Sequence, residues 1–167
     1  PATARGRWIA EATVEATRAQ WSMRSARLEW AAWIRWSDSE ARLRRDGLTA
    51  EAMELAGVEG WWARHAYTRA TVLRPGFAAG VLARTRTRVQ ECGAWLVASS
   101  AADATASLLD VGARFERMAL SLDELGLAAH PMTQLLETPG GAEALSEALS
   151  LGETPRLLVR LGYARTG

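Results

Sequence analysis

The sequence is poor in the residue types that mark several kinds of site. Among its 167 residues Cys92 is the single cysteine, His65 and His130 are the two histidines, and lysine is absent. One cysteine excludes an internal disulfide and any zinc site built on several thiolates. The two histidines stand far apart, without metal-ligand spacing, so we predict no metal site. This cysteine usage fits a reducing, cytoplasmic setting.

Charge and hydropathy exclude further classes of protein. The net charge is +1, which predicts neither a nucleic-acid partner nor an acidic membrane surface. No apolar run approaches the roughly 20 residues that span a bilayer, and no signal-peptide pattern opens the chain. With 49% hydrophobic residues, the composition is typical of a globular domain with a real core. We therefore expect a single domain over residues 1–167.

Motifs for nucleophilic catalysis and for nucleotide binding are also missing. The sequence contains no serine or cysteine nucleophile motif, no P-loop and no GxGxxG. Cys92 precedes an apolar run and is expected to be a small core residue. The alternating RTRTR of residues 84–88 is expected to be a solvated edge leading into a strand, because no aromatic residues interleave for base stacking.

Two early segments, residues 7–20 and 24–36, carry apolar residues at the spacing of amphipathic helices. Such a stripe is more often core or a subunit contact than a ligand platform. In the second segment the stripe holds four residues: Ala26, Trp30, Trp33 and Ile34.

Capping signals predict two shorter helices after these. Ser37 and Glu40 have the spacing of a capping box, and the helix that they start is expected to stop at the Asp-Gly pair of residues 46–47. Thr49 is expected to cap a brief helix over residues 50–55.

Residues 57–80 show no clean period and are interrupted by glycines and a proline. We predict a loop with short helical pieces there. Because this long segment is rich in aromatic residues, Trp61, Trp62 and His65 are hypothesised to act as a lid over a site.

The second half contains two apolar runs that predict strands. Residues 94–98 are expected to form a strand buried on both faces, and another strand begins at Pro155. Between them Asp103 is expected to cap a long helix that reaches Leu125, with Gly126 at its stop. One broad apolar face of this helix holds six residues: Leu108, Val111, Phe115, Met118, Leu122 and Leu125.

Helices followed by two late strands predict an α+β fold. Two strands do not make a stable sheet by themselves. We therefore expect the sheet to be completed by missing chain or by a second subunit.

The segment GLAAHPMTQ, residues 126–134, is expected to be a loop, yet it is mostly apolar. Surface loops are usually polar, because polar residues satisfy their own backbone groups in water. Such a loop therefore either lies under other elements or packs against a ligand. Since conventional catalytic residues are missing, the second alternative predicts a cofactor that carries the chemistry, held by backbone amides in an apolar slot.

Three stretches resemble the flavin-dependent nitroreductase family, in particular a bacterial nitroreductase-like branch. They are EWAAWIRW with DGLTAEAMEL, then LLDVGARFERMALSLDELGLAAHPMTQLLE, then PRLLVRLGYA. In that branch an E-x-x-x-W-I-R segment precedes DGLT, a helix ends in LGL before an SPxNQ-like loop, and P-x-L-L-x-R-L-G-Y forms a strand. The likeness covers most of residues 20–165 and rests on order and spacing rather than on one specific motif.

The resemblance implies an α+β sandwich that forms a tight homodimer with FMN at the subunit interface. It also implies hydride transfer from NAD(P)H through the flavin to nitroaromatics, quinones or related acceptors. In the family, the loop after the long helix offers backbone amides to the flavin ring; the matching positions here are Pro131, Met132, Thr133 and Gln134. Because proline has no N–H, the expected donors are Thr133 and Gln134, with His130 and Met132 as pocket walls.

The chain departs from the family pattern at both ends. In the family an N-terminal segment of Arg-Ser-x-Arg type binds the flavin phosphate; no segment is assigned that role here, because the tetrapeptide of this type at residues 24–27 is predicted to open a helix. Arg165 is the basic residue left to follow the last strand. These departures lead us to expect either the C-terminal portion of a longer or split enzyme, or a degenerate relative that sequesters flavin without turnover. A helical interaction module that binds a partner through its tryptophan stripe is the third alternative.

Overall fold

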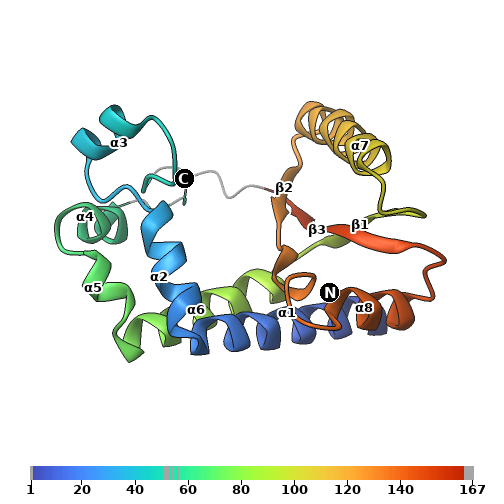
Figure 1. Cartoon of the computed structure of the whole chain (residues 1–167), viewed down its shortest axis with the longest axis horizontal. Helices are drawn as coiled ribbons and strands as arrows, with labels where there is room; N and C mark the ends of the chain where they lie inside the picture. The colour runs from blue at the N-terminus through green and yellow to red at the C-terminus, as the bar shows by residue number, and fades with distance from the viewer. Residues whose placement is uncertain (1, 51–52, 54, 56, 164–167) are drawn as a thin grey trace. The chain divides into compact units, whose positions relative to one another are not determined.

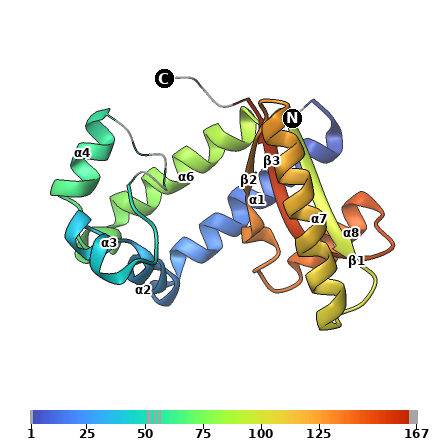
Figure 2. The ribbon, with the colours of Figure 1, turned by 90° about the horizontal axis from the view of Figure 1, so that it is seen from above.

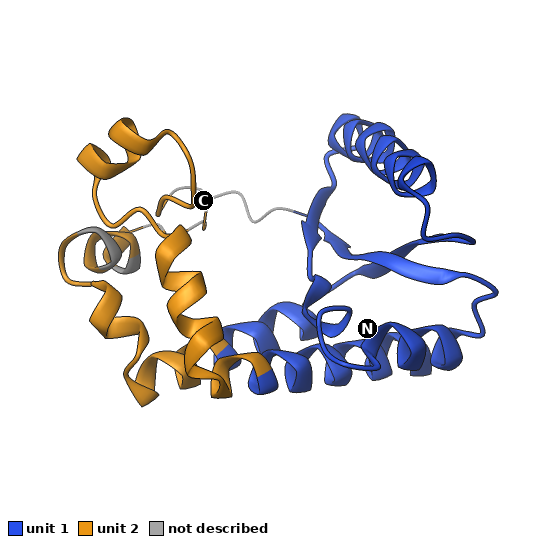
Figure 3. Ribbon diagram, in the orientation of Figure 1, with its two compact units in different colours: residues 1–19, 82–167 blue, residues 20–81 orange. Residues whose placement is uncertain are grey.

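The computed structural model describes residues 2–50, 53, 55 and 57–163, without the side chains of residues 59, 63 and 64. The chain divides into two compact units, the first made of residues 1–19 and 82–167 and the second of residues 20–81 (Figure 3). The expectation of one nitroreductase-like domain over the whole chain stays a prediction.

The first unit contains a three-stranded antiparallel sheet. Its strands are β1 (Ala94–Ser100), β2 (Ala128–Pro131) and β3 (Thr154–Gly162), in the order β1-β3-β2, so that β3 lies in the middle (Figure 2). The α+β class and two of the strands are as predicted. The third strand was not: residues 128–131, expected to belong to a loop, pair with β3. The apolar character of residues 128–131 is therefore explained by their place in a sheet.

Helices cover both faces of this sheet (Figure 1). Helix α7 (Thr105–Glu124) packs on one face, and α1 (Ala4–Ser22) and α8 (Gly141–Leu149) lie on the other. The main apolar cluster joins α1 and α8 to the sheet, since burying apolar side chains between layers is what holds such a unit together. Its buried members are Ile9, Ala16, Leu135, Leu145 and Leu158.

Strand β1 is half-buried, whereas we expected it to be buried on both faces. The reason is its position at an edge of the sheet, where β3 is the only described strand bonded to it. The register between them shifts after Ala98, because Ala98 pairs with Leu157 and Ser99 with Pro155, which leaves Arg156 of β3 without an opposite residue.

The ends of α7 differ in how well the sequence predicted them. At the N-terminus the capping residue is Ala104, which makes no side-chain cap. The expectation that Asp103 caps this helix is wrong, because its carboxylate pairs instead with Arg156 of β3 at 3.0 Å. At the C-terminus Gly126 has a φ of +67°, the left-handed conformation that ends helices. The apolar face is also shorter than predicted, since Leu125 is 70% exposed.

The second unit contains the helices α2 (Arg24–Trp33), α3 (Asp38–Arg44), α4 (Gly57–His65) and α5 (Arg69–Val72). Rings of four aromatic residues pack in its interior with centroid separations of 5.2–5.8 Å. They are Trp21, Trp30, Tyr67 and Phe77. Trp33 of the predicted stripe is 55% exposed and lies outside this cluster.

Residues 57–80 are mostly helical, and the prediction of a loop with short pieces is wrong. Helix α4 begins at Gly57, and α6 (Pro75–Gln90) begins at Pro75. Proline is favoured in the first turn of a helix, where no N–H bond is lost. Gly57 and Pro75 therefore begin helices here and do not interrupt them.

Helix α6 also contains the RTRTR stretch of residues 84–88, which is therefore not the strand edge that we expected. Thr85 is buried while Arg86 is exposed, as the turn of a helix requires. The brief helix expected over residues 50–55 includes residues outside those described. In the part of the chain that is described, no helix has the length and apolar content needed to cross a membrane.

Candidate functional site

The predicted cofactor segment is the end of β2 together with the 3-10 turn η1 (Thr133–Leu135) that follows it. His130 stands opposite Arg160 of β3, and its Nδ1 accepts a hydrogen bond from the Arg160 Nε at 2.9 Å. A neutral imidazole that accepts at Nδ1 carries its proton on Nε2. The bond from Arg160 therefore holds the His130 ring in one orientation, with its proton on Nε2.

Met132 is the most enclosed residue of this segment, with 3% of its surface exposed. Its side chain packs against Ala10 and Val89, and its backbone N–H donates to the Leu158 carbonyl at 2.8 Å. The residue thus anchors the turn to the core, and its amide is already used. That it forms a wall of a cofactor pocket stays a prediction.

Thr133 and Gln134 lie at the start of η1, where the first N–H groups have no acceptor inside the turn. Neither backbone N–H is bonded to another residue in the described part of the chain. The Thr133 hydroxyl donates to Glu137 at 3.1 Å, which fixes its rotamer. The side-chain oxygen of Gln134 is buried and has no hydrogen-bond partner among the described residues. Buried polar atoms are nearly always bonded, so this one marks a place where a further group is needed.

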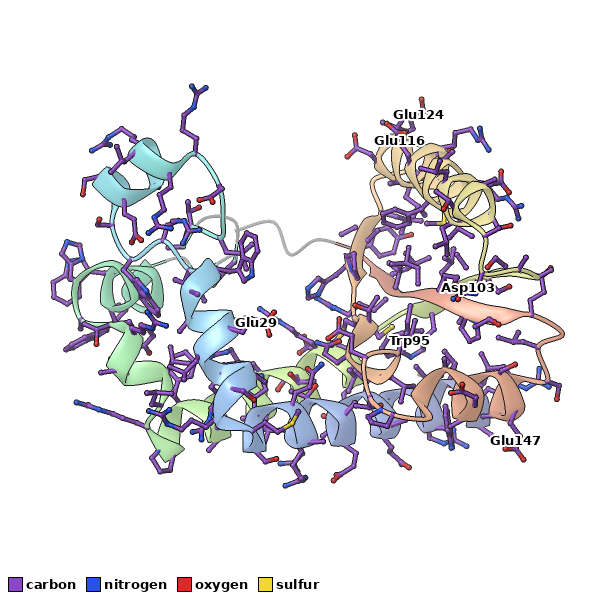
Figure 4. The ribbon with its side chains drawn as sticks, viewed as in Figure 1. Glu29, Trp95, Asp103, Glu116, Glu124 and Glu147 are labelled. Atoms are coloured by element: carbon purple, nitrogen blue, oxygen red, sulfur yellow. The ribbon has the colours of Figure 1, made fainter. Side chains whose placement is uncertain are left out.

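A row of three side chains crosses the sheet beside this turn. Trp95 of β1 stands opposite Arg160 of β3, which in turn stands opposite His130 of β2. Trp95 reaches toward the layer of α1 and α8 (Figure 4), and its indole Nε1 is buried without a described partner. Neither Trp95 nor Arg160 is predicted as a site residue from the sequence. Side chains alternate between the two faces of a strand, so Trp95 and Arg160 can be placed on the same face once the β1–β3 register is known.

The other residues predicted for the site lie outside the described part of the first unit. Arg165 lies outside the described residues. The hypothesised lid residues belong to α4, in the second unit: Trp61 and Trp62 are 52% and 50% exposed. His65 stacks on Trp61 with ring centroids 4.8 Å apart, and its Nδ1 lies 2.8 Å from the Trp61 carbonyl oxygen.

Cys92 is buried, as predicted, and its Sγ lies 2.8 Å from the carbonyl oxygen of Ala94. It is therefore a core residue rather than an exposed nucleophile. A separate depression of about 520 Å³ lies where α8 meets the start of β3. Three carboxylates line it, those of Glu143, Glu147 and Glu153. Among the described residues no three His, Cys, Asp or Glu side chains are grouped as metal ligands would be.

Comparison of the chain with protein-family models, with curated proteins and with solved structures found no match.

Proposed function

We propose that the chain is an FMN-dependent oxidoreductase of the nitroreductase type, with the flavin ring against the turn of residues 130–134. The observation that carries this proposal is the pair of unbonded backbone N–H groups of Thr133 and Gln134 beside a histidine–arginine pair. The resemblance of the segment to the flavin loop of that family supports it.

The donor set of the turn fits the edge of a flavin ring, which presents carbonyl oxygens and ring nitrogens as acceptors. The donors are the two backbone N–H groups of Thr133 and Gln134, and Arg160 holds the His130 ring beside them. The guanidinium of Arg160 adds positive charge next to His130, and a cation in a partly buried site stabilises negative charge on a bound group. When bound, FMN supplies the hydride chemistry, and the protein supplies binding, orientation and charge.

A first test is the absorbance spectrum of the purified chain, followed by titration with FMN and measurement of flavin fluorescence. Thr133→Pro removes one proposed donor, and proline suits the first position of a turn, so the fold is expected to survive. Loss of one hydrogen bond is worth about 0.5–1.5 kcal/mol, and we expect the Kd for FMN to rise about 2- to 12-fold. Thr133→Val keeps the N–H and is the matched control, with a Kd close to that of the wild type.

Two outcomes would contradict parts of this proposal. If the chain has no flavin bands and takes up no FMN, the oxidoreductase function is rejected. If it binds FMN but NAD(P)H does not bleach the flavin, the chain is a flavin-binding protein that does not turn over, the alternative expected from the sequence. An unchanged Kd in Thr133→Pro would move the flavin site away from this turn.

A further inference from the structure

The two edges of the sheet differ in how they are protected against pairing with another strand. The β2 edge is four residues long and ends in Pro131, and short length and proline both discourage pairing. The β1 edge is seven residues long, AWLVASS, and contains neither proline nor a charged residue. Edge strands with these properties are templates for a further strand.

The backbone groups on the free edge of β1 follow from the ladder on its other side. The Leu158 carbonyl accepts from Met132, so Leu158 directs its backbone groups toward β2. Neighbouring residues of an antiparallel strand point to opposite sides, and Leu157 and Val159 therefore face β1. Their partners on β1 are Ala98 and Leu96.

The alternate residues of β1, Trp95, Val97 and Ser99, consequently direct their N–H and C=O groups away from β3. No hydrogen bond joins these outward groups to another residue of the described chain. Six backbone groups in a regular row are therefore left for a partner, because each of the three residues offers one donor and one acceptor.

We propose that a second copy of this chain pairs with β1 in antiparallel fashion, centred on Val97, and so joins the two sheets into one. In this register Val97 faces Val97 of the second copy, and Trp95 faces Ser99 of the second copy. Each of these pairs exchanges two hydrogen bonds. The large indole meets a small side chain across the junction, so the pairing is not blocked by two bulky residues.

The strand is complementary to itself, which favours a second copy as the occupant of this edge. An antiparallel pair centred on Val97 uses the same three outward residues, Trp95, Val97 and Ser99, in both copies. Such a pair is closed by two-fold symmetry, so the association stops at two copies. The strand itself is uncharged, so no like charges oppose each other across the junction.

The apolar side chains of β1 support the same inference. Trp95, Leu96 and Val97 are half-buried in the isolated chain. A neighbouring strand would remove more of their surface from water, which favours association. This inference does not depend on flavin binding, because it rests on the β1 edge and not on the turn after β2. A monomer that binds FMN and a dimer that does not would each contradict one proposal alone.

The test begins with the mass of the chain in solution, measured by light scattering over a range of concentrations. We expect twice the 18.1 kDa of the single chain. Val97→Pro removes an outward N–H and leaves the β1–β3 ladder intact, and we expect it to be monomeric with an unchanged circular dichroism spectrum. Val97→Ile keeps the N–H and is expected to remain dimeric.

Cross-linking provides a second test that does not depend on tolerance of proline. Residues that form a hydrogen-bonded antiparallel pair have Cα atoms about 5.5 Å apart, within the range of a disulfide. Val97→Cys is therefore expected to form a covalent dimer under mild oxidation, whereas Ser121→Cys, on an exposed part of α7, is not. A chain of 18.1 kDa at every concentration overturns the proposal. So does a dimer that persists in Val97→Pro and is not trapped by Val97→Cys.

Discussion

Gly141, the first residue of α8, is buried and has no room for a side chain. A Cβ there would lie 2.6 Å from the Thr138 hydroxyl oxygen, and the Leu135 carbonyl oxygen is nearer still. We expect Gly141→Ala to lower the free energy of unfolding by about 1–3 kcal/mol, because backbone must move to admit the methyl group. Gly112→Ala in α7 is the control, and we expect it to raise the free energy of unfolding. Nothing lies within 4 Å of its Cβ position, and removing glycine from a helix stabilises it by about 1 kcal/mol. Urea unfolding of both variants measures the difference, and equal effects would contradict this account of the turn.

Among the elements, α3 is short and depends on its N-cap. The Ser37 hydroxyl accepts from the Glu40 N–H at 3.2 Å, and Asp38 and Glu40 place negative charge in the first turn. Since losing such a cap costs about 1 kcal/mol, we expect Ser37→Ala to speed amide exchange in the helix about 5-fold. Hydrogen exchange followed by mass spectrometry measures this. The matched control is Ser39→Ala, whose hydroxyl bonds to that of Ser37 and to no other group of the described residues. Equal protection in wild type and Ser37→Ala would show that tertiary packing, not the cap, holds α3.

At the scale of the whole molecule, the second unit is a continuous insertion into the first. All buried members of the two apolar clusters lie outside residues 20–81. We therefore expect a chain in which a flexible Gly-Ser linker replaces residues 20–81 to keep the first unit folded. This variant retains only Trp8 and Trp95, both packed against the main cluster, so tryptophan fluorescence reports its unfolding. A cooperative transition is the expected result, shifted to lower urea by Leu158→Ala, which costs about 2–5 kcal/mol in a core. A transition that is gradual from the start would mean that the first unit needs the second.

Local signals in the sequence predicted the elements whose causes are local. The cap at Ser37, the stop at Gly126 and the apolar runs of β1 and β3 each depend on a few neighbouring residues. Strand β2 is not predictable from the sequence, because four residues are too few for a visible alternation and because a proline such as Pro131 is more typical of a loop. Asp103 was misassigned because its ion partner, Arg156, is far away in sequence.

The candidate site shows the same division between local and distant causes. The sequence predicted residues 126–134 as a loop after the long helix; in the structure β2 lies between α7 and η1 and contains His130 and Pro131. Trp95 and Arg160 enter the same neighbourhood only through strand pairing. Trp95 is 65 positions from Arg160, and Arg160 is 30 positions from His130, so no local pattern could have grouped them.

The discontinuous first unit has a consequence for the order in which the chain folds during its synthesis. Ile9 and Ala16 find their partners in Leu145 and Leu158, so α1 must wait for nearly the whole chain before its apolar face is covered. The second unit has all of its residues available once residue 81 has been added. Contacts between distant residues form slowly, because a long loop must close first. The middle of the protein is thus expected to fold on the ribosome, while its first helix remains exposed to chaperones until β3 emerges.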